Sequence, residues 1–180
     1  DKGTFVYNRE KKVFTNFLDE LYCKNRYLID EKRVKSIYED YSGNIWFGTN
    51  QGLFKFEKDV KVIIPYYHDF EEDLSISSND INTIYEDSER NLWIGTDLGL
   101  NRFENNTQIF EKLKYEKNSN RGLSHNTVYS ICEDSNKNLW IGTGAGLNKL
   151  DHSTGFFSYF SEKNGLPNNQ IYCIIKDRDK

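Results

Sequence analysis

The segment NLWIGTDLGLNRF, residues 91–103, decides the fold, because the chain repeats it in closely similar form 47 residues before and 47 residues after. The earlier copy is NIWFGTNQGLFKF (44–56), and the later copy is NLWIGTGAGLNKL (138–150). Windows of 23 residues that contain these segments agree at nine positions in all three copies. A period of about 40 to 50 residues is typical of solenoids, propellers and other repeat arrays.

Turn signals divide the middle unit into short strands. The first strand is β-branched and apolar, and a tight loop follows it, in which the Asp87 carboxylate is placed to cap the turn. The matching loop in the first unit contains Gly43, which suggests a positive φ that Arg90 and Lys137 adopt in the other copies. Four strands are predicted in the middle unit: INTIYED (81–87), NLWIGT (91–96), one that begins LNRF (100–103), and TQIFEKL (107–113).

Four short antiparallel strands in a unit too small to bury its own faces describe a β-propeller blade. A helical repeat is excluded, because no window has a sustained 3.6-residue period and the paired Gly residues would break a helix. The predicted fold is therefore all-β, with about four blades in an open arc of a larger propeller. The predicted units are the end of a blade (1–21), three blades (34–67, 81–114 and 128–161) and the first strand of the next blade (171–180).

The repeated residues are expected to hold the blades together. The Trp should fill the gap between one twisted blade and the next, and the Gly beside it should let the sheets approach. Truncating Trp93 should therefore be costly, whereas Trp46 should matter less if its neighbouring blade is incomplete. The structural repeat motif comprises Asp40, Asn44, Trp46, Gly48, Gly52, Asp87, Asn91, Trp93, Gly95, Gly99, Asp134, Asn138, Trp140, Gly142 and Gly146.

Composition narrows the function classes. The net charge of −4 argues against a nucleic-acid partner, and no apolar run is long enough to span a membrane. Neither the three Cys (Cys23, Cys132, Cys173) nor the three His (His68, His125, His152) have disulfide-framework or metal-site spacing. We therefore expect no metal, no cofactor and no catalytic residue. Because the chain starts at Asp1 and contains no Met, it is expected to be a piece of a longer polypeptide.

The repeats TIYEDSERNLWIGTDLGLNRFE (83–104) and SICEDSNKNLWIGTGAGLNKLD (130–151) resemble the two-component regulator propeller repeat. The linkers DLSISSNDI (73–81), GLSHNTV (122–128) and NGLPNNQI (164–171) resemble the stretches that join blades in that family. This resemblance implies the extracytoplasmic, periplasmic or extracellular, sensor region of a bacterial hybrid two-component or related signalling protein. Such regions usually carry many blades, a β-sandwich domain, a membrane helix, and a histidine kinase or another output domain.

Three functions remain open at the level of sequence. The first is a non-catalytic sensory module whose ligand, by resemblance, is an oligosaccharide; the candidate binding residues are Tyr66, Tyr67, His68 and Asn79, which also read as ordinary loop residues. The second is a propeller enzyme of the glycosidase or lyase type. Its acids would have to be non-repeated, because the Glu-Asp pairs recur in every blade. The third is a dimerisation scaffold, with a homodimer formed through open blade edges and the remaining blades of the parent as further partners.

Overall fold

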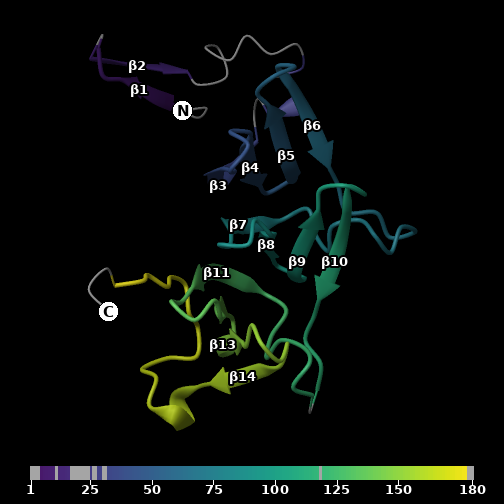
Figure 1. Cartoon of the computed structure of the whole chain (residues 1–180), viewed down its shortest axis with the longest axis vertical. Helices are drawn as coiled ribbons and strands as arrows, with labels where there is room; N and C mark the ends of the chain where they lie inside the picture. The colour runs from purple at the N-terminus through teal and green to yellow at the C-terminus, as the bar shows by residue number, and fades with distance from the viewer. Residues whose placement is uncertain are drawn as a thin grey trace.

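The computed structural model describes residues 5–10, 12–16, 25, 28–29, 32–117 and 119–177. Three antiparallel four-stranded sheets follow a two-stranded hairpin along the chain (Figure 1). The predicted all-β class and four-stranded blades are confirmed. The elements are β1 (Phe5–Asn8), β2 (Val13–Asn16), β3 (Val34–Glu39), β4 (Ile45–Thr49), β5 (Gly52–Glu57), β6 (Val62–Tyr66), β7 (Ile81–Glu86), β8 (Leu92–Thr96), β9 (Gly99–Glu104), β10 (Ile109–Leu113), β11 (Val128–Glu133), β12 (Leu139–Thr143), β13 (Gly146–Leu150), β14 (Phe157–Phe160) and the short 3-10 helix η2 (Glu162–Asn164).

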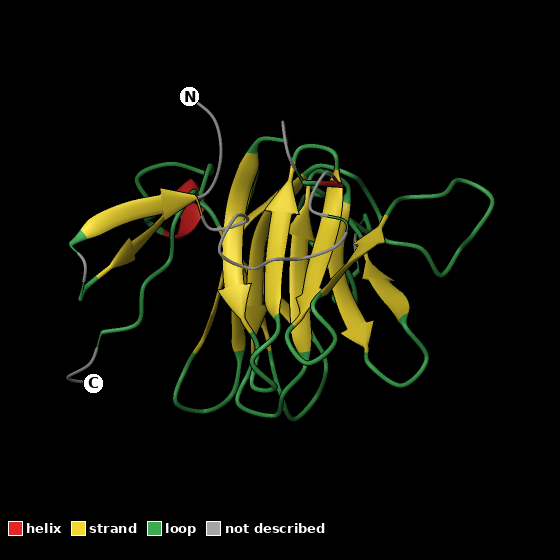
Figure 2. Ribbon diagram, turned by 90° about the horizontal axis from the view of Figure 1, so that it is seen from above, coloured by secondary structure: helices red, strands yellow, loops and turns green. Residues whose placement is uncertain are grey.

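The three sheets are blades 1 (β3–β6), 2 (β7–β10) and 3 (β11–β14), and they form an open arc. Figure 1 shows the first strands of the blades along one margin of the arc and the fourth strands along the opposite margin. The first strand of blade 2 contacts the first strands of both neighbouring blades, so these are the inner strands. Seen from above, the N-terminal hairpin lies to one side of the sheets (Figure 2). The hairpin and the C-terminal segment lie apart (Figure 1), which confirms the expected open arc.

The tight loop between the first and second strands has the expected backbone. Gly43 has φ 81°, and the matching Arg90 and Lys137 have φ 71° and 65°. A side chain in this left-handed region costs on the order of 1 kcal/mol. The loop is closed in blade 2 by the Arg90 N–H, which donates to the Asp87 carbonyl at 3.0 Å. The sequence prediction of a shared positive-φ position is confirmed.

The repeated Gly on the second strand is the point of closest approach between blades. A Cβ on Gly95 would lie 2.6 Å from Val128 Cγ1, on the inner strand of the next blade. A Cβ on Gly48 would likewise lie 2.7 Å from Ile81 Cγ2. Real Cβ atoms do not approach so closely, so the sheets can pack at this distance only because the side chain is absent. The predicted role of the Gly residue is confirmed.

The Trp residues pack against the blade that follows them. Trp46 is fully buried with Ile81, Ile84 and Phe103 of blade 2, and its ring centroid lies 5.1 Å from that of Phe103. The condition under which Trp46 was expected to matter less is therefore not met, because the blade that covers it is complete. The partly exposed Trp is Trp140, on the last blade that the structure describes. Which neighbour a Trp contacts depends on the direction in which its strand faces, and this direction is a tertiary property.

The predicted first strand at 171–180 is a further correction. Residues 171–177 form no strand, and residues 178–180 lie outside the described part of the chain. Ile171 does donate its N–H to the Thr143 carbonyl at 3.0 Å, and its carbonyl lies over Gly142 as Val128 lies over Gly95. A strand also needs a hydrogen-bonded ladder, and no described segment pairs with 171–177 on its other side. Residues 1–4 and 17–21 of the first predicted unit are likewise outside the described residues.

Candidate functional site

The repeated Asp is a structural acceptor. In blade 2, Asp87 Oδ1 accepts hydrogen bonds from the backbone N–H groups of Glu89 and Asn91, each at 2.9 Å. Asp87 Oδ2 accepts from Asn91 Nδ2 at 2.9 Å and from Trp93 Nε1 at 2.8 Å. The carboxylate thus caps the loop, as predicted, and also fixes the Trp ring, which the sequence did not indicate. The same Asp–Trp bond joins Asp40 to Trp46 and Asp134 to Trp140.

These hydrogen bonds change the acidity of Asp134. Burial opposes its ionisation, but the hydrogen bonds from Asn138, Trp140 and the loop backbone prevail and lower the pKa of Asp134 from 3.8 to about 2. A carboxyl group whose pKa is lowered on folding stabilises the fold fully above its ordinary pKa. This stabilisation is lost as the pH falls from 3.8 through about 2. At neutral pH the group is a fixed anion, which suits a cap and not a general acid.

In blades 2 and 3, the Glu of the repeated Glu-Asp pair joins its blade to the preceding one. Glu86 of blade 2 accepts the Tyr41 backbone N–H of blade 1 at 2.8 Å. Glu133 of blade 3 accepts both the N–H of Ser88, at 3.1 Å, and its hydroxyl, at 2.8 Å. Both repeated acids therefore have structural partners. The sequence indicated a structural role through repetition alone, and it carried no signal for the partner of the Glu.

The turn between the second and third strands uses the repeated Thr and the second repeated Gly. Thr96 Oγ1 donates to the Gly99 carbonyl at 3.0 Å and accepts the Leu98 N–H at 3.1 Å. Gly99 has φ 140°, a conformation that side chains rarely adopt. Gly52 and Gly146 share this positive φ, at 131° and 127°. The repeated Asp and Thr side chains are thus hydrogen-bonded within their own blade.

The sequence-predicted binding residues lie together at the end of β6 and in the connection to β7. Tyr66 stacks on Trp46 at 5.7 Å between ring centroids, and burial, with the charge of Glu57 as a smaller cause, raises the pKa of Tyr66 to about 12. Tyr67 is 45% exposed and packs edge-on against Phe54. Tyr66 therefore presents little surface to a ligand, whereas Tyr67 remains accessible.

A hydrogen bond joins the Asn79 side chain to the His68 backbone. Asn79 Oδ1 accepts the His68 backbone N–H at 2.8 Å, and His68 Nδ1 lies 2.8 Å from the Ile76 carbonyl. Asn126 and Asn169 occupy the same place in the next two connections, where they accept the N–H of Tyr115 at 2.6 Å and of Glu162 at 2.9 Å. Asn79 is thus one copy of a repeated brace. The Asn two residues before β7, before β11 and before Ile171 is the sequence signal that would have revealed it.

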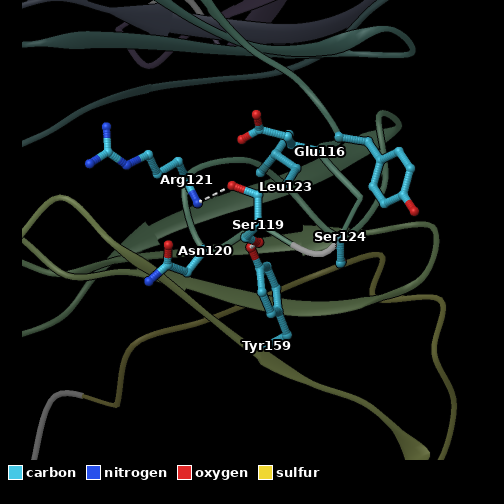
Figure 3. A pocket seen from close by; sticks show the side chains of 8 residues that line it. Glu116, Ser119, Asn120, Arg121, Leu123, Ser124 and Tyr159 are labelled. Atoms are coloured by element: carbon cyan, nitrogen blue, oxygen red, sulfur yellow. Dashed lines mark hydrogen bonds between the residues drawn. The ribbon is translucent and has the colours of Figure 1, made fainter.

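A second group of polar side chains, which the sequence reasoning missed, surrounds an open hollow of about 710 Å³ (Figure 3). The hollow lies between the connection from blade 2 to blade 3 and the outer strand β14. Its lining differs from the repeat motif, because Leu74 stands where Arg121 does in the preceding connection, although Asp69 stands where Glu116 does. The principal lining residues are Tyr115, Glu116, Ser119, Asn120, Arg121 and Tyr159.

Contacts with β14 shape the hollow. The Tyr159 hydroxyl lies 2.6 Å from the Ser119 carbonyl oxygen and 2.8 Å from that of Gly122, within hydrogen-bond distance of both. The Phe157 N–H donates to the Asn120 carbonyl at 2.7 Å. Burial, and secondarily the nearby charge of Glu116, raises the pKa of Tyr159. The connection is therefore held against blade 3 by a neutral Tyr159 hydroxyl.

Three of the polar side chains that line the hollow have no hydrogen-bond partner within the described part of the protein. The side chains of Glu116, Asn120 and Arg121 make no hydrogen bond or ion pair with any other residue that the structure describes. In the view of Figure 3, Asn120 and Arg121 lie on the same side of the hollow, and Tyr159 lies at the other end from Glu116. The dashed line there joins the Arg121 backbone N–H to Ser119 Oγ, at 3.0 Å. The Arg121 guanidinium lies over the Phe156 ring, 5.7 Å from its centroid. Its N–H groups, the Glu116 carboxylate and the Asn120 amide remain available for hydrogen bonds to a ligand.

The described lining of the hollow contains a single carboxylate. Glu116 is the one carboxylate among the described residues that line it, whereas a glycosidase of the usual type needs two.

Within the described residues, no three His, Cys, Asp or Glu side chains gather as a metal site. Cys23 lies outside these residues, Cys132 is half-buried on β11, and Cys173 is exposed. No helix in this part of the chain has the length and apolarity to cross a membrane.

The fold and the repeated contacts define the chain as an arc of β-propeller blades with a polar hollow at one blade junction. The family model of the two component regulator propeller matches residues 28–51, 75–97 and 122–145, one match in each blade region. The chain therefore contains three repeats of the two component regulator propeller family, which confirms the resemblance seen in the sequence.

Three solved structures are similar to the chain in fold, and one of them is also similar in sequence. The extracellular domain assigned to the hybrid two component system BT3049 of B. thetaiotaomicron is 33% identical over 78% of this chain, with a TM-score of 0.70; the chain spans 20% of that protein. PorZ, a surface component of the type-IX secretion system of Porphyromonas gingivalis, is 16% identical over 94% of this chain and 26% of its own (TM-score 0.64). Virginiamycin B lyase of Staphylococcus aureus is 15% identical over 87% and 47% (TM-score 0.57).

The last two likenesses show the propeller fold alone. No curated protein is detectably similar in sequence to the chain.

Proposed function

We propose that the chain is a ligand-sensing segment of the extracytoplasmic propeller of a bacterial two-component receptor. The observation that carries this proposal is the similarity to the extracellular domain of BT3049, at 33% identity over 78% of the chain. In such a receptor the propeller would bind a ligand outside the membrane and pass the change to a histidine kinase or another output domain. The proposed ligand is an oligosaccharide.

The distribution of polar groups supports binding without catalysis. In blades 2 and 3, the repeated Asp, Glu and Thr side chains are engaged within or between blades, so they are not free to act on a substrate. Glu116, the acid in the hollow, has no second carboxylate among the described lining residues. A general acid without a partner nucleophile or base does not hydrolyse a glycosidic bond by the two-carboxylate route. Tyr67, which is exposed beside Tyr66, remains a second proposed contact for ligand.

Incubation with oligosaccharides separates sensing from catalysis. We expect isothermal titration of the chain with a panel of defined oligosaccharides to show saturable binding of at least one of them. Chromatography of the same mixtures after prolonged incubation should return every oligosaccharide unchanged, because the binding groups include no catalytic pair. Product formation that Glu116→Gln abolishes would establish the enzyme instead.

The open face of blade 3 supports a further role as a contact surface. Trp140 stacks on Phe160 with ring centroids 5.6 Å apart, as Trp46 stacks on Tyr66 in blade 1. The pair in blade 1 is covered by blade 2, whereas Trp140 and Phe160 are only half-buried. Exposed apolar surface of this kind favours association, and we propose a second copy of the chain as the partner.

Light scattering over a concentration series tests this association. The mean mass should rise with concentration because two open faces then cover each other. Phe160→Ser should reduce the rise, whereas Phe70→Ser, at a side chain that is 92% exposed on the connection between blades 1 and 2, should leave it unchanged. A monomer mass at every concentration would rule out pairing through this face.

A further inference from the structure

We propose that the hollow between the blade 2–blade 3 connection and β14 binds one uncharged, polyhydroxylated sugar ring of an oligosaccharide. This inference rests on the proposed sensing function and assigns that function to a place and to a charge class of ligand. The observation behind it is that three exposed polar side chains, Glu116, Asn120 and Arg121, line one hollow at a blade junction without hydrogen-bond partners among the described residues (Figure 3).

The donors and acceptors of the hollow match a polyol. Glu116 offers only acceptor oxygens, Arg121 offers only N–H donors, and the Asn120 amide offers both. A sugar hydroxyl can donate to the carboxylate and accept from the guanidinium, and both bonds are strengthened by the charge on the protein side. A ring with several hydroxyl groups can satisfy all three side chains together. An apolar ligand would leave them unpaired and desolvated.

The charges of the hollow select against ions. Glu116 and Arg121 are the charged side chains among its described lining residues, so their charges cancel. An anionic ring, such as a uronate, gains from Arg121 but is repelled by Glu116. A cationic ring, such as a deacetylated amino sugar, is attracted by Glu116 but repelled by Arg121. A neutral ring alone meets no like charge, and electrostatic discrimination of this kind is a common source of specificity.

An aromatic surface is available for the apolar face of the ring. Tyr115 lines the hollow and is 49% exposed. Its backbone is fixed, because the Tyr115 N–H donates to Asn126 Oδ1 at 2.6 Å. A half-exposed aromatic ring on a braced backbone offers a contact surface that loses little conformational freedom when a ligand binds.

The site is specific to this junction. Strand pairing places Tyr159 opposite Asn148 in blade 3 and Lys112 opposite Asn101 in blade 2, so Lys112 occupies the place of Tyr159. A Lys cannot reproduce the phenol that reaches the carbonyls of Ser119 and Gly122. The preformed loop is therefore a property of one blade junction, and a bound ring would contact both the connection and the blade that follows it.

Charge-changing variants provide the test. The probes are neutral gluco-, manno-, galacto- and xylo-oligosaccharides, with oligogalacturonates as anions and chitosan oligosaccharides as cations, measured by titration calorimetry. We expect the wild-type chain to prefer a neutral probe. Arg121→Gln and Asn120→Ala should weaken its binding about 10- to 100-fold, as expected for loss of a charge-assisted or a paired hydrogen bond.

The selectivity should change in opposite directions. Glu116→Gln should improve binding of the anionic probe relative to the neutral one, and Arg121→Gln should do the same for the cationic probe. A purely structural role would not produce this exchange. Glu72→Gln, at an exposed Glu in the connection between blades 1 and 2, is the matched control and should leave binding of every probe unchanged. Thermal denaturation should confirm that all variants remain folded, since the three altered side chains are exposed.

The possible outcomes distinguish the place of the ligand, its charge class and the proposed sensing function. Neutral binding that survives all three pocket variants would place the ligand elsewhere and leave the sensing function intact. A wild-type preference for the anionic or cationic probe would overturn the charge class. If no probe binds, both this site and the carbohydrate part of the proposed function are wrong.

Discussion

Replacing Trp93 with Ala is expected to lower the free energy of unfolding by about 3–5 kcal/mol, the range for truncation of a large buried aromatic side chain. Trp93 is 6% exposed and belongs to a core cluster with Leu123, Val128 and Ile131. The cavity left by Ala would open between two β-sheets that are already braced by backbone hydrogen bonds, so they cannot collapse to fill it. Urea denaturation followed by circular dichroism measures the change.

Trp140→Ala is the matched control for this substitution. Trp140 occupies the same repeat position and makes the same hydrogen bond to its Asp, but it is only half-buried. Its truncation should therefore have a clearly smaller effect, because less apolar surface is re-exposed and no closed cavity forms. Equal effects at Trp93 and Trp140 would show that the Trp stabilises its own blade and not the junction with the next blade.

Asp87→Ala is the second substitution with a large expected effect, a loss of about 2–4 kcal/mol in the free energy of unfolding. Asp87 is 7% exposed and accepts four hydrogen bonds, one of them from the Trp93 indole. Without the carboxylate, the indole N–H and the Asn91 amide lose their acceptor in a place that water reaches poorly. An unpaired buried donor is more costly than a lost exposed hydrogen bond.

Asp151→Ala tests whether burial is the cause. Asp151 also accepts four hydrogen bonds, from the backbone and hydroxyl groups of Ser153 and Thr154, but at an exposed turn. Water can replace its carboxylate there, so the expected loss of stability is smaller than at Asp87. The two variants can be compared in the same denaturation experiment. If Asp151→Ala is as destabilising as Asp87→Ala, the number of hydrogen bonds matters and their burial does not.

The blade itself could be predicted from the sequence because its defining interactions are local. The Asp87 cap spans four residues, and the positive φ shared by Gly43, Arg90 and Lys137 belongs to one tight loop. Repetition strengthened these local signals, since the same pattern occurs three times at a constant spacing of 47 residues. Repetition also separated structural acids from candidate catalytic ones, although it could not name the partner of each acid.

The functional candidates were less accessible to sequence reasoning. Tyr66 and Asn79 looked like loop residues near one connection, yet Tyr66 packs against the core and Asn79 accepts a hydrogen bond from the His68 backbone. Glu116 and Arg121 carried no pattern at all, because a site formed by non-repeated residues has no internal copy to compare. They were recognised as lining a common hollow only in the structure, where Tyr159, which is distant in sequence, contacts their loop.

The sequence by itself determined the all-β class, the strands of each blade, the capped loop at Asp87 and the need for Gly at position 95. These features follow from hydrogen bonds and steric limits within about one blade, so neighbouring residues encode them. The tertiary structure alone decided that Trp46 is covered and Trp140 is not, and that Glu133 binds Ser88. It also brought Tyr159 to the loop at Ser119. Such contacts join residues of different blades, and their geometry depends on how one twisted sheet packs against the next.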